Sequence, residues 1–149
     1  MIHYLIGDAT EPITDKYRIV CHVVNDEGRW GRGFVVAVSQ KWPKAETSYK
    51  AHSPMPLGTT DLVYIDSNTI IASMCAQHSV YKADINELPL RYDALELCLQ
   101  QIAKIFSGST WSIHMPRIGC GLARGKWDKV EAIINESLKN MDVYVYDLQ

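Results

Sequence analysis

Short apolar runs rich in β-branched residues alternate along the chain with longer segments in which apolar positions recur every three or four residues. The first pattern is typical of strands and the second of helices, so the alternation predicts an α/β fold. Several of the short runs are apolar on both faces, as in strands that helices cover on each side. We expect strands at residues 2–6, 18–24, 61–65, 69–75, 110–114 and 143–146.

Three helical segments are expected between these strands. The first follows Gly31-Arg32-Gly33, runs through residues 34–38 and breaks near Trp42-Pro43, because proline disfavours helical backbone at the residue before it. A further turn or helix is expected from this break to His52.

The other two helices are predicted from apolar stripes and end signals. One starts near Leu90 and stops at Gly108, with a stripe formed by Leu95, Leu99, Ile102 and Phe106. The last starts with Asp128 as its N-cap, has Glu131 three residues further on and ends near Asn140. Its expected buried face consists of Val130, Ile133, Ile134 and Leu138.

Composition narrows the class of protein. The length of 149 residues suits one domain, so we expect a single domain over residues 1–149. The formal charge of −2 does not favour nucleic acid, whose recognition usually needs a basic face. None of the four cysteines is spaced as C-x-x-C, and we expect no metal and no cofactor. Without a signal-peptide pattern or an apolar stretch of ~18 residues, the expectation is a cytoplasmic monomer that contacts no membrane.

Two glycine-rich loops lead from strands into helices, at residues 25–34 and 116–125. In open α/β sheets, ligands bind where strands end and such loops begin. Glycines there let backbone N–H groups approach an anion, although the first loop could equally be an ordinary tight surface turn. Three glycines close together in the second loop indicate backbone wrapped closely around something. Neither loop has the P-loop pattern, and the first does not match the dinucleotide fingerprint G-x-G-x-x-G. Two anion-tolerant loops suit a ligand with a pyrophosphate and flanking sugars.

At these positions the sequence resembles the macro domain family. Gly7-Asp8-Ala9-Thr10 is similar to the family's G-D-[ILV]-T element, and Val24-Asn25 with Gly31-Arg32-Gly33 is similar to its first phosphate loop. Residues 116–122 and 144–148 resemble its second phosphate loop and closing strand, in the branch of terminal ADP-ribose glycohydrolases and O-acetyl-ADP-ribose deacetylases. The resemblance implies a three-layer α/β/α fold with a mixed central sheet of about six strands.

The resemblance also implies an ADP-ribose site. Asp8 would accept a hydrogen bond from the adenine amino group, Ala9 would donate a backbone N–H, and Tyr146 and Leu148 would pack on the adenine. The diphosphate and distal ribose would be lined by Gly31, Arg32, Gly33, Phe34, Gly119, Cys120, Gly121, Leu122 and Ala123.

Two departures concern catalysis. The glycohydrolase branch has an aspartate with a central catalytic role where this chain has Ala123. Residues 73–82 contain no lysine at the place of that branch's catalytic lysine, and Lys82 is several residues late. A Schiff-base mechanism needs such a lysine, so the resemblance supports binding more strongly than glycohydrolase chemistry.

Three other side chains are candidates for catalysis. His22 could exchange protons or be an ordinary core histidine, and His78 could reach the distal ribose or be a plain polar loop residue. Asn25 could fix a ribose hydroxyl or orient a water. Asp26 and Glu27 could act as a general base or pair with the loop arginines, and Cys120 is interpreted as a small side chain between glycines.

These residues indicate two classes of function, and a third class is a weaker alternative. The first is an enzyme that binds ADP-ribose and hydrolyses an acetyl ester, a 1''-phosphate or a protein- or nucleic-acid-linked group from its distal ribose. The second is a reader module that binds ADP-ribose without turnover, as Ala123 and the missing lysine indicate. The third is an unrelated α/β nucleotide binder.

Overall fold

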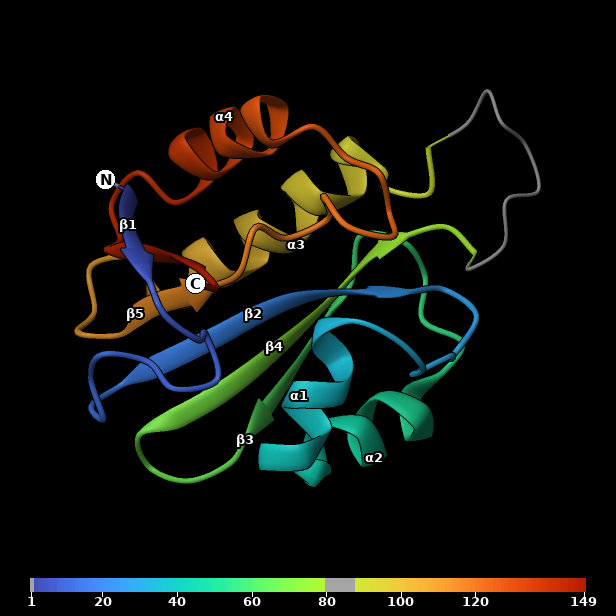
Figure 1. The fold of residues 1–149 in the computed structure, drawn as a ribbon, viewed down its shortest axis with the longest axis horizontal. Helices are drawn as coiled ribbons and strands as arrows, with labels where there is room; N and C mark the ends of the chain where they lie inside the picture. Colours follow the sequence, from blue (N-terminus) through green and yellow to red (C-terminus); the bar gives the residue numbers. More distant parts are fainter. Residues whose placement is uncertain (1, 80–87) are drawn as a thin grey trace.

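The computed structural model describes residues 2–79 and 88–149, which form one sheet between two pairs of helices (Figure 1). The elements follow the chain as β1 (Ile2–Ile6), β2 (Arg18–Asn25), α1 (Phe34–Lys41), α2 (Pro43–His52), β3 (Thr60–Tyr64), β4 (Thr69–Gln77), α3 (Tyr92–Phe106), β5 (Ser112–Met115), α4 (Trp127–Ser137) and β6 (Val143–Asp147).

The six strands are ordered β1-β6-β5-β2-β4-β3. Every neighbouring pair is parallel except β3 and β4, which are antiparallel. The expected three-layer α/β/α architecture with a mixed six-stranded sheet is therefore confirmed, and the strand bounds differ from the expected ones by at most two residues at either end.

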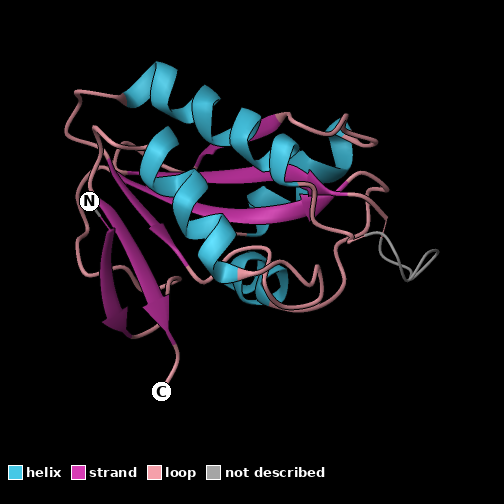
Figure 2. Ribbon diagram, turned by 90° about the horizontal axis from the view of Figure 1, so that it is seen from above, coloured by secondary structure: helices cyan, strands magenta, loops and turns pink. Residues whose placement is uncertain are grey.

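The central strands are apolar on both faces because both faces are buried under helices. Eight of the nine residues of β4 are buried, because helices cover both faces of this strand. Helices α3 and α4 pack against each other over one face, where the predicted stripe of α3 is buried (Figure 2). Helices α1 and α2 cover the other face, and the small cluster under them contains Val20, Val38, Ala45, Val63 and Ile71.

The break predicted in the first helical segment is confirmed. Trp42 has φ −131° and ψ 75°, which is not helical, and Pro43 opens α2 at a position where its missing N–H costs nothing.

The predicted start of the last helix is wrong. Lys126, not Asp128, is the N-cap of α4, and its N–H donates to the Tyr92 hydroxyl at 3.0 Å. Asp128 lies inside the first turn, and Glu131 accepts a hydrogen bond from the Tyr4 hydroxyl instead of closing a capping box. Contacts with α3 and β1 therefore set this helix end, where the sequence pattern suggested a local cap.

The connections place a topological switch point between β2 and β5. The chain leaves β2 toward α1 on one face of the sheet, and it leaves β5 toward α4 on the other (Figure 1). Neighbouring parallel strands whose connections diverge in this way form the switch point at which open α/β sheets bind ligands. The two glycine loops predicted from the sequence are the two that leave from this point.

Candidate functional site

The loop after β2 is held by the side chain of Asn25. Its Oδ1 accepts the N–H groups of Glu27 (3.0 Å) and Arg29 (3.1 Å), and its Nδ2 donates to the Arg29 carbonyl at 2.7 Å. The Tyr49 hydroxyl donates to the Asn25 main-chain carbonyl at 2.6 Å. Asn25 is 7% exposed, so the structure gives it a role in shaping the loop. Contact between its side chain and a ligand stays a prediction.

The same loop leads into the N-terminus of α1, which has no side-chain cap. Gly33 is the N-cap of α1 with φ 77°, a conformation that favours glycine, and no side chain caps the helix. Among residues 2–79 and 88–149, no atom lies within 4 Å of a β-carbon added at Gly31 or Gly33, so these residues leave space beside both glycines. The first turn of α1 has no acidic residue, and Arg32 is exposed beside it. Unpaired N–H groups at an uncapped helix start attract anions.

The glycines of the second loop divide into two kinds. A β-carbon at Gly119 would lie 2.7 Å from Leu90 Cδ2, and one at Gly125 would lie 2.3 Å from that same atom. We expected backbone wrapped closely around something in this loop. At Gly119 and Gly125, the enclosed group is the side chain of Leu90. No atom of the described residues lies within 4 Å of a β-carbon added at Gly121, and Leu122 is 65% exposed. Gly121 and Leu122 are exposed in this loop, and their contact with a ligand stays a prediction.

Cys120 and Ala123 lie deeper in the same loop. Burial raises the pKa of the Cys120 thiol, and its Sγ donates to the Ile118 carbonyl, as expected for a small packed side chain rather than a nucleophile. Ala123 is buried, and its carbonyl accepts the Leu90 N–H at 3.2 Å.

The residues expected at the adenine end lie where β1 and β6 finish. The Asp8 Oδ1 accepts the Thr10 N–H and hydroxyl at 2.9 and 2.7 Å, so Asp8 shapes a turn with one oxygen, and Ala9 is buried beside it. Leu148 is 80% exposed. Tyr146 is buried, and its hydroxyl accepts the Ile13 N–H at 3.1 Å, so this ring already belongs to the core.

His22 is a buried histidine. Its Nε2 lies 2.8 Å from the Ser73 Oγ, and its ring packs against Trp30 and Phe34. Burial lowers the pKa of His22 to about 3, so the imidazole is neutral under ordinary conditions. The Nδ1 has no hydrogen-bond partner within residues 2–79 and 88–149. Trp30, which also contacts Tyr49, anchors the loop to the core.

His78 contacts Asp26, a carboxylate that we expected either to act as a general base or to pair with a loop arginine. Its Nδ1 lies 2.7 Å from Asp26 Oδ2, whereas Glu27 makes the expected ion pair with Arg29 at 3.3 Å. Asp26 and His78 each follow the last residue of a strand, and those last residues, Asn25 and Gln77, are partners in the β2–β4 register. If β2 and β4 had been assumed to be neighbouring parallel strands, the sequence would have predicted this pair.

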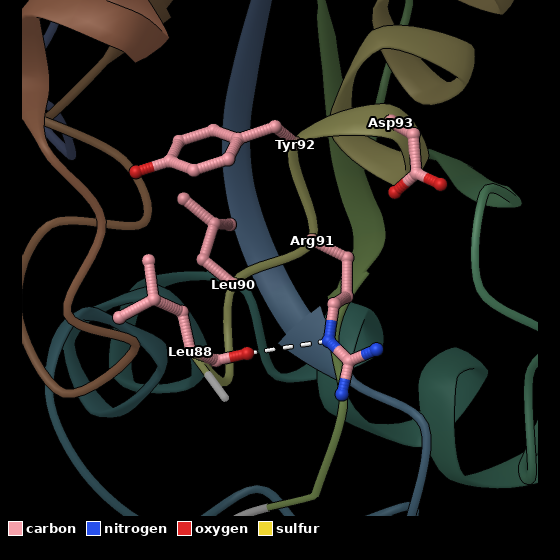
Figure 3. Close-up of a pocket in the computed structure, with 5 residues that line it drawn as sticks. All are labelled: Leu88, Leu90, Arg91, Tyr92 and Asp93. Carbon is pink, nitrogen blue, oxygen red and sulfur yellow. Dashed lines mark hydrogen bonds between the residues drawn. The ribbon is translucent and has the colours of Figure 1, made fainter. Parts of the chain in front are cut away.

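A cavity of about 450 Å³ lies where the chain enters α3, lined by Leu88, Leu90, Arg91, Tyr92 and Asp93 (Figure 3). The Arg91 N–H donates to the Ala76 carbonyl of β4, and the Tyr92 hydroxyl holds the start of α4. The cavity therefore adjoins the end of β4 and the second glycine loop. Lys82, the late lysine of the sequence comparison, lies outside the described residues.

Comparisons with known proteins agree with this architecture. A macrodomain protein from Streptomyces coelicolor is 34% identical and has a TM-score of 0.83, with 99% of each chain covered. An ADP-ribose 1''-phosphate phosphatase from Lodderomyces elongisporus is 26% identical over 97% of this chain and 97% of its own. A chromodomain-helicase-DNA-binding protein 1-like from Danio rerio is 28% identical over 96% of this chain, which spans only 15% of that relative. No protein-family model matches the chain.

Proposed function

Because the chain belongs to the macro domain family, we propose that it binds ADP-ribose between the β2 and β5 loops and hydrolyses a group from the distal ribose. The observation that carries the proposal is the pair of open glycine backbones on either side of the switch point. Gly31 and Gly33 border one side and Gly121 the other, and at each of them the part of the chain that the structure describes leaves room where a side chain would stand.

The charges at this switch point suit a diphosphate. The uncapped start of α1 presents backbone N–H groups and a positive dipole end to one side of it. Arg32 is exposed at the same helix start, and a guanidinium binds phosphate oxygens well. The adenine would then lie toward β1 and β6, at Asp8, Ala9, Tyr146 and Leu148, and the distal ribose toward β4, at His78.

The group that is removed belongs to one of three classes: a 1''-phosphate, an acetyl ester, or a protein or nucleic acid attached to the ribose. The name of the Lodderomyces relative, an ADP-ribose 1''-phosphate phosphatase, supports the first. We expect the N–H groups of the glycine loops to stabilise the negative charge that develops on the attacked group.

The test is to incubate the protein with each derivative and to identify the products by mass spectrometry, with calorimetry of ADP-ribose and AMP alongside. We expect micromolar or tighter binding of ADP-ribose, weaker binding of AMP, and release of free ADP-ribose from at least one derivative. Binding AMP as tightly as ADP-ribose would contradict the proposed site, because the two loops would then make no favourable contact with the second phosphate and the distal ribose.

A non-catalytic reader is the second candidate, and Ala123 is the observation that favours it. The residue is buried and its carbonyl is engaged with Leu90, so the loop has no carboxylate at the position that the glycohydrolase branch uses. Tight binding of ADP-ribose without turnover of any derivative is the result expected of a reader. A protein or nucleic acid that carries ADP-ribose would then be the partner, bound by this domain as a monomer.

A further inference from the structure

Two side chains that leave neighbouring strands meet at the carboxyl edge of the sheet. Asp26 follows β2, His78 follows β4, and the Asp26 Oδ2 lies 2.7 Å from the His78 Nδ1. The Asp26 side chain is 18% exposed and that of His78 is 52% exposed. The carboxylate is therefore the more buried group and the imidazole the more exposed one. In catalytic pairs of this kind, the exposed group acts as the base and the buried group orients it.

Both oxygens of the carboxylate are engaged. Oδ1 accepts the Ser79 N–H at 2.8 Å, and Oδ2 faces His78. Burial by itself would raise the pKa of Asp26, but the hydrogen bonds from Ser79 and His78 outweigh it and hold the pKa below its ordinary value. The carboxylate is thus ionised at neutral pH and can only accept hydrogen bonds.

The backbone is shaped to maintain this contact. Ser79 has φ 63°, a left-handed conformation that is unfavourable for a non-glycine residue. Its N–H donates to Asp26 and its carbonyl accepts from Gln77 Nε2 at 2.9 Å, so both of its peptide groups are held. On the other side, the Asp26 N–H donates to the Gln77 carbonyl at 3.0 Å. Strained residues held in this way gather at functional sites.

We propose that His78 is the general base of the hydrolysis and that Asp26 is its positioning residue, which keeps the hydrogen on Nδ1 and the lone pair on Nε2. This role rests on the proposed function. A neutral imidazole whose Nδ1–H is donated to a carboxylate offers only Nε2 as a base, and the carboxylate thereby keeps the ring in the productive tautomer.

The step balances for an acyl ester on the distal ribose. Nε2 takes a proton from water, and the water oxygen forms a bond to the acyl carbon while the carbonyl electron pair moves to its oxygen. When that pair returns, the bond from the acyl carbon to the ribose oxygen breaks, and the ribose oxygen leaves with its electrons and receives the proton from Nε2. The imidazole is regenerated, and no other reactant is needed.

Substitution Asp26→Asn tests the tautomer directly. An asparagine can still accept the Ser79 N–H, but its amide donates to Nδ1 and so forces the hydrogen of His78 onto Nε2. Long-range ¹H–¹⁵N correlation spectra of histidine-labelled protein, assigned with His78→Gln, should show the Nδ1–H form in the wild type and the Nε2–H form in the variant. An Nε2–H form in the wild type would overturn the proposal, whatever the protein hydrolyses.

Kinetics then separate positioning from folding. We expect D26N and H78Q to lose roughly 10²–10⁴-fold in kcat and to bind ADP-ribose within about threefold of the wild type. A matched control is His52→Gln, because His52 makes a second histidine–carboxylate contact, 3.7 Å from Asp61, and is 64% exposed. H52Q should leave kcat unchanged.

The outcomes distinguish this role from the proposed function. Full activity of D26N in a protein that hydrolyses a derivative overturns the role of Asp26 and leaves the proposed function standing. A wild type that binds ADP-ribose and hydrolyses nothing overturns both hydrolysis and the base, and leaves the reader.

Discussion

Leu90 fills the space that a side chain at Gly119 would need. Its Cδ2 would lie 2.7 Å from an added β-carbon there, and its N–H donates to the Ala123 carbonyl of the same loop. Leu90 also bridges to Gln77 at the end of β4. One buried leucine therefore ties the second glycine loop to the end of β4, the strand that His78 follows.

The first prediction concerns stability. Gly119→Ala places a β-carbon against Leu90 at a residue with φ 72°, so the free energy of unfolding should fall by roughly 1–3 kcal/mol. Gly125→Ala should cost more, because its β-carbon would also meet the Gly119 carbonyl oxygen at 2.6 Å, which a side-chain rotation cannot relieve. Urea unfolding with a constant m-value measures both. Equal stability of both variants and the wild type would refute this packing.

The second prediction concerns binding and uses a third glycine of that loop. The methyl group of Gly121→Ala meets no atom within 4 Å among the residues that the structure describes, so the unfolding free energy of the variant should stay within about 1 kcal/mol of the wild type. If Gly121 faces the diphosphate, the new methyl group should weaken ADP-ribose binding by roughly tenfold or more. Calorimetry decides, and unchanged affinity would remove Gly121 from the ligand contact.

The third prediction concerns the base of the nucleotide. Asp8→Asn keeps an oxygen for the Thr10 N–H and hydroxyl, so the turn should survive. An asparagine amide donates where the carboxylate accepts, so ADP-ribose affinity should fall by roughly 1–3 kcal/mol. The hypoxanthine analogue, which has a carbonyl in place of the amino group, should lose less or gain. A variant with the wild-type preference for adenine would show that Asp8 does not read the base.

The fourth prediction concerns acid stability. Burial lowers the pKa of His22 to about 3, and burial with the nearby Arg18 charge lowers that of His114 to about 4. An unfolded histidine titrates near 6.5, so between pH 6.5 and 4 the unfolded chain binds more protons than the folded one. Stability is fully present above pH 6.5 and falls as the pH drops, by roughly 2–3 kcal/mol per histidine at pH 4.5.

Glutamine variants give the matching control for this effect. His22→Gln can keep a hydrogen bond to Ser73 without titrating, and His114→Gln can do the same toward Ser112. Each substitution should flatten the slope of unfolding free energy against pH between 6.5 and 4.5, by up to about 1.4 kcal/mol per pH unit. Slopes identical to the wild type would mean that neither buried ring titrates on unfolding.

The fifth prediction concerns a clamp between the second loop and β6. Arg117 donates to both Asp147 oxygens, at 2.7 and 3.0 Å, and its guanidinium lies over the rings of Tyr4 and Trp127. The pair is exposed, so Arg117→Lys should change the unfolding free energy by less than about 1 kcal/mol. It should nevertheless speed amide exchange in residues 116–122, because a lysine cannot replace the fork and the stacking. Unaltered exchange in that segment would refute the clamp.

Most elements of this fold are readable from local patterns. The apolar stripe of α3 and the break at Trp42-Pro43 need only periodicity and the restricted backbone of proline. The start of α4 is different, because Tyr92 and Tyr4 act on it from remote parts of the chain. A rule based on neighbouring residues cannot predict those contacts.

By itself, the sequence determined the strands and helices, the α/β class and the two glycine loops, because each depends on neighbours within a few residues. The tertiary structure decided what each glycine does, since Gly119 encloses Leu90 while Gly121 stays open. It also decided that His22 is buried and that His78 meets Asp26, because strand order and register bring residues 26 and 78 together. Contacts across 52 positions of chain follow from sheet topology, which short-range patterns do not encode.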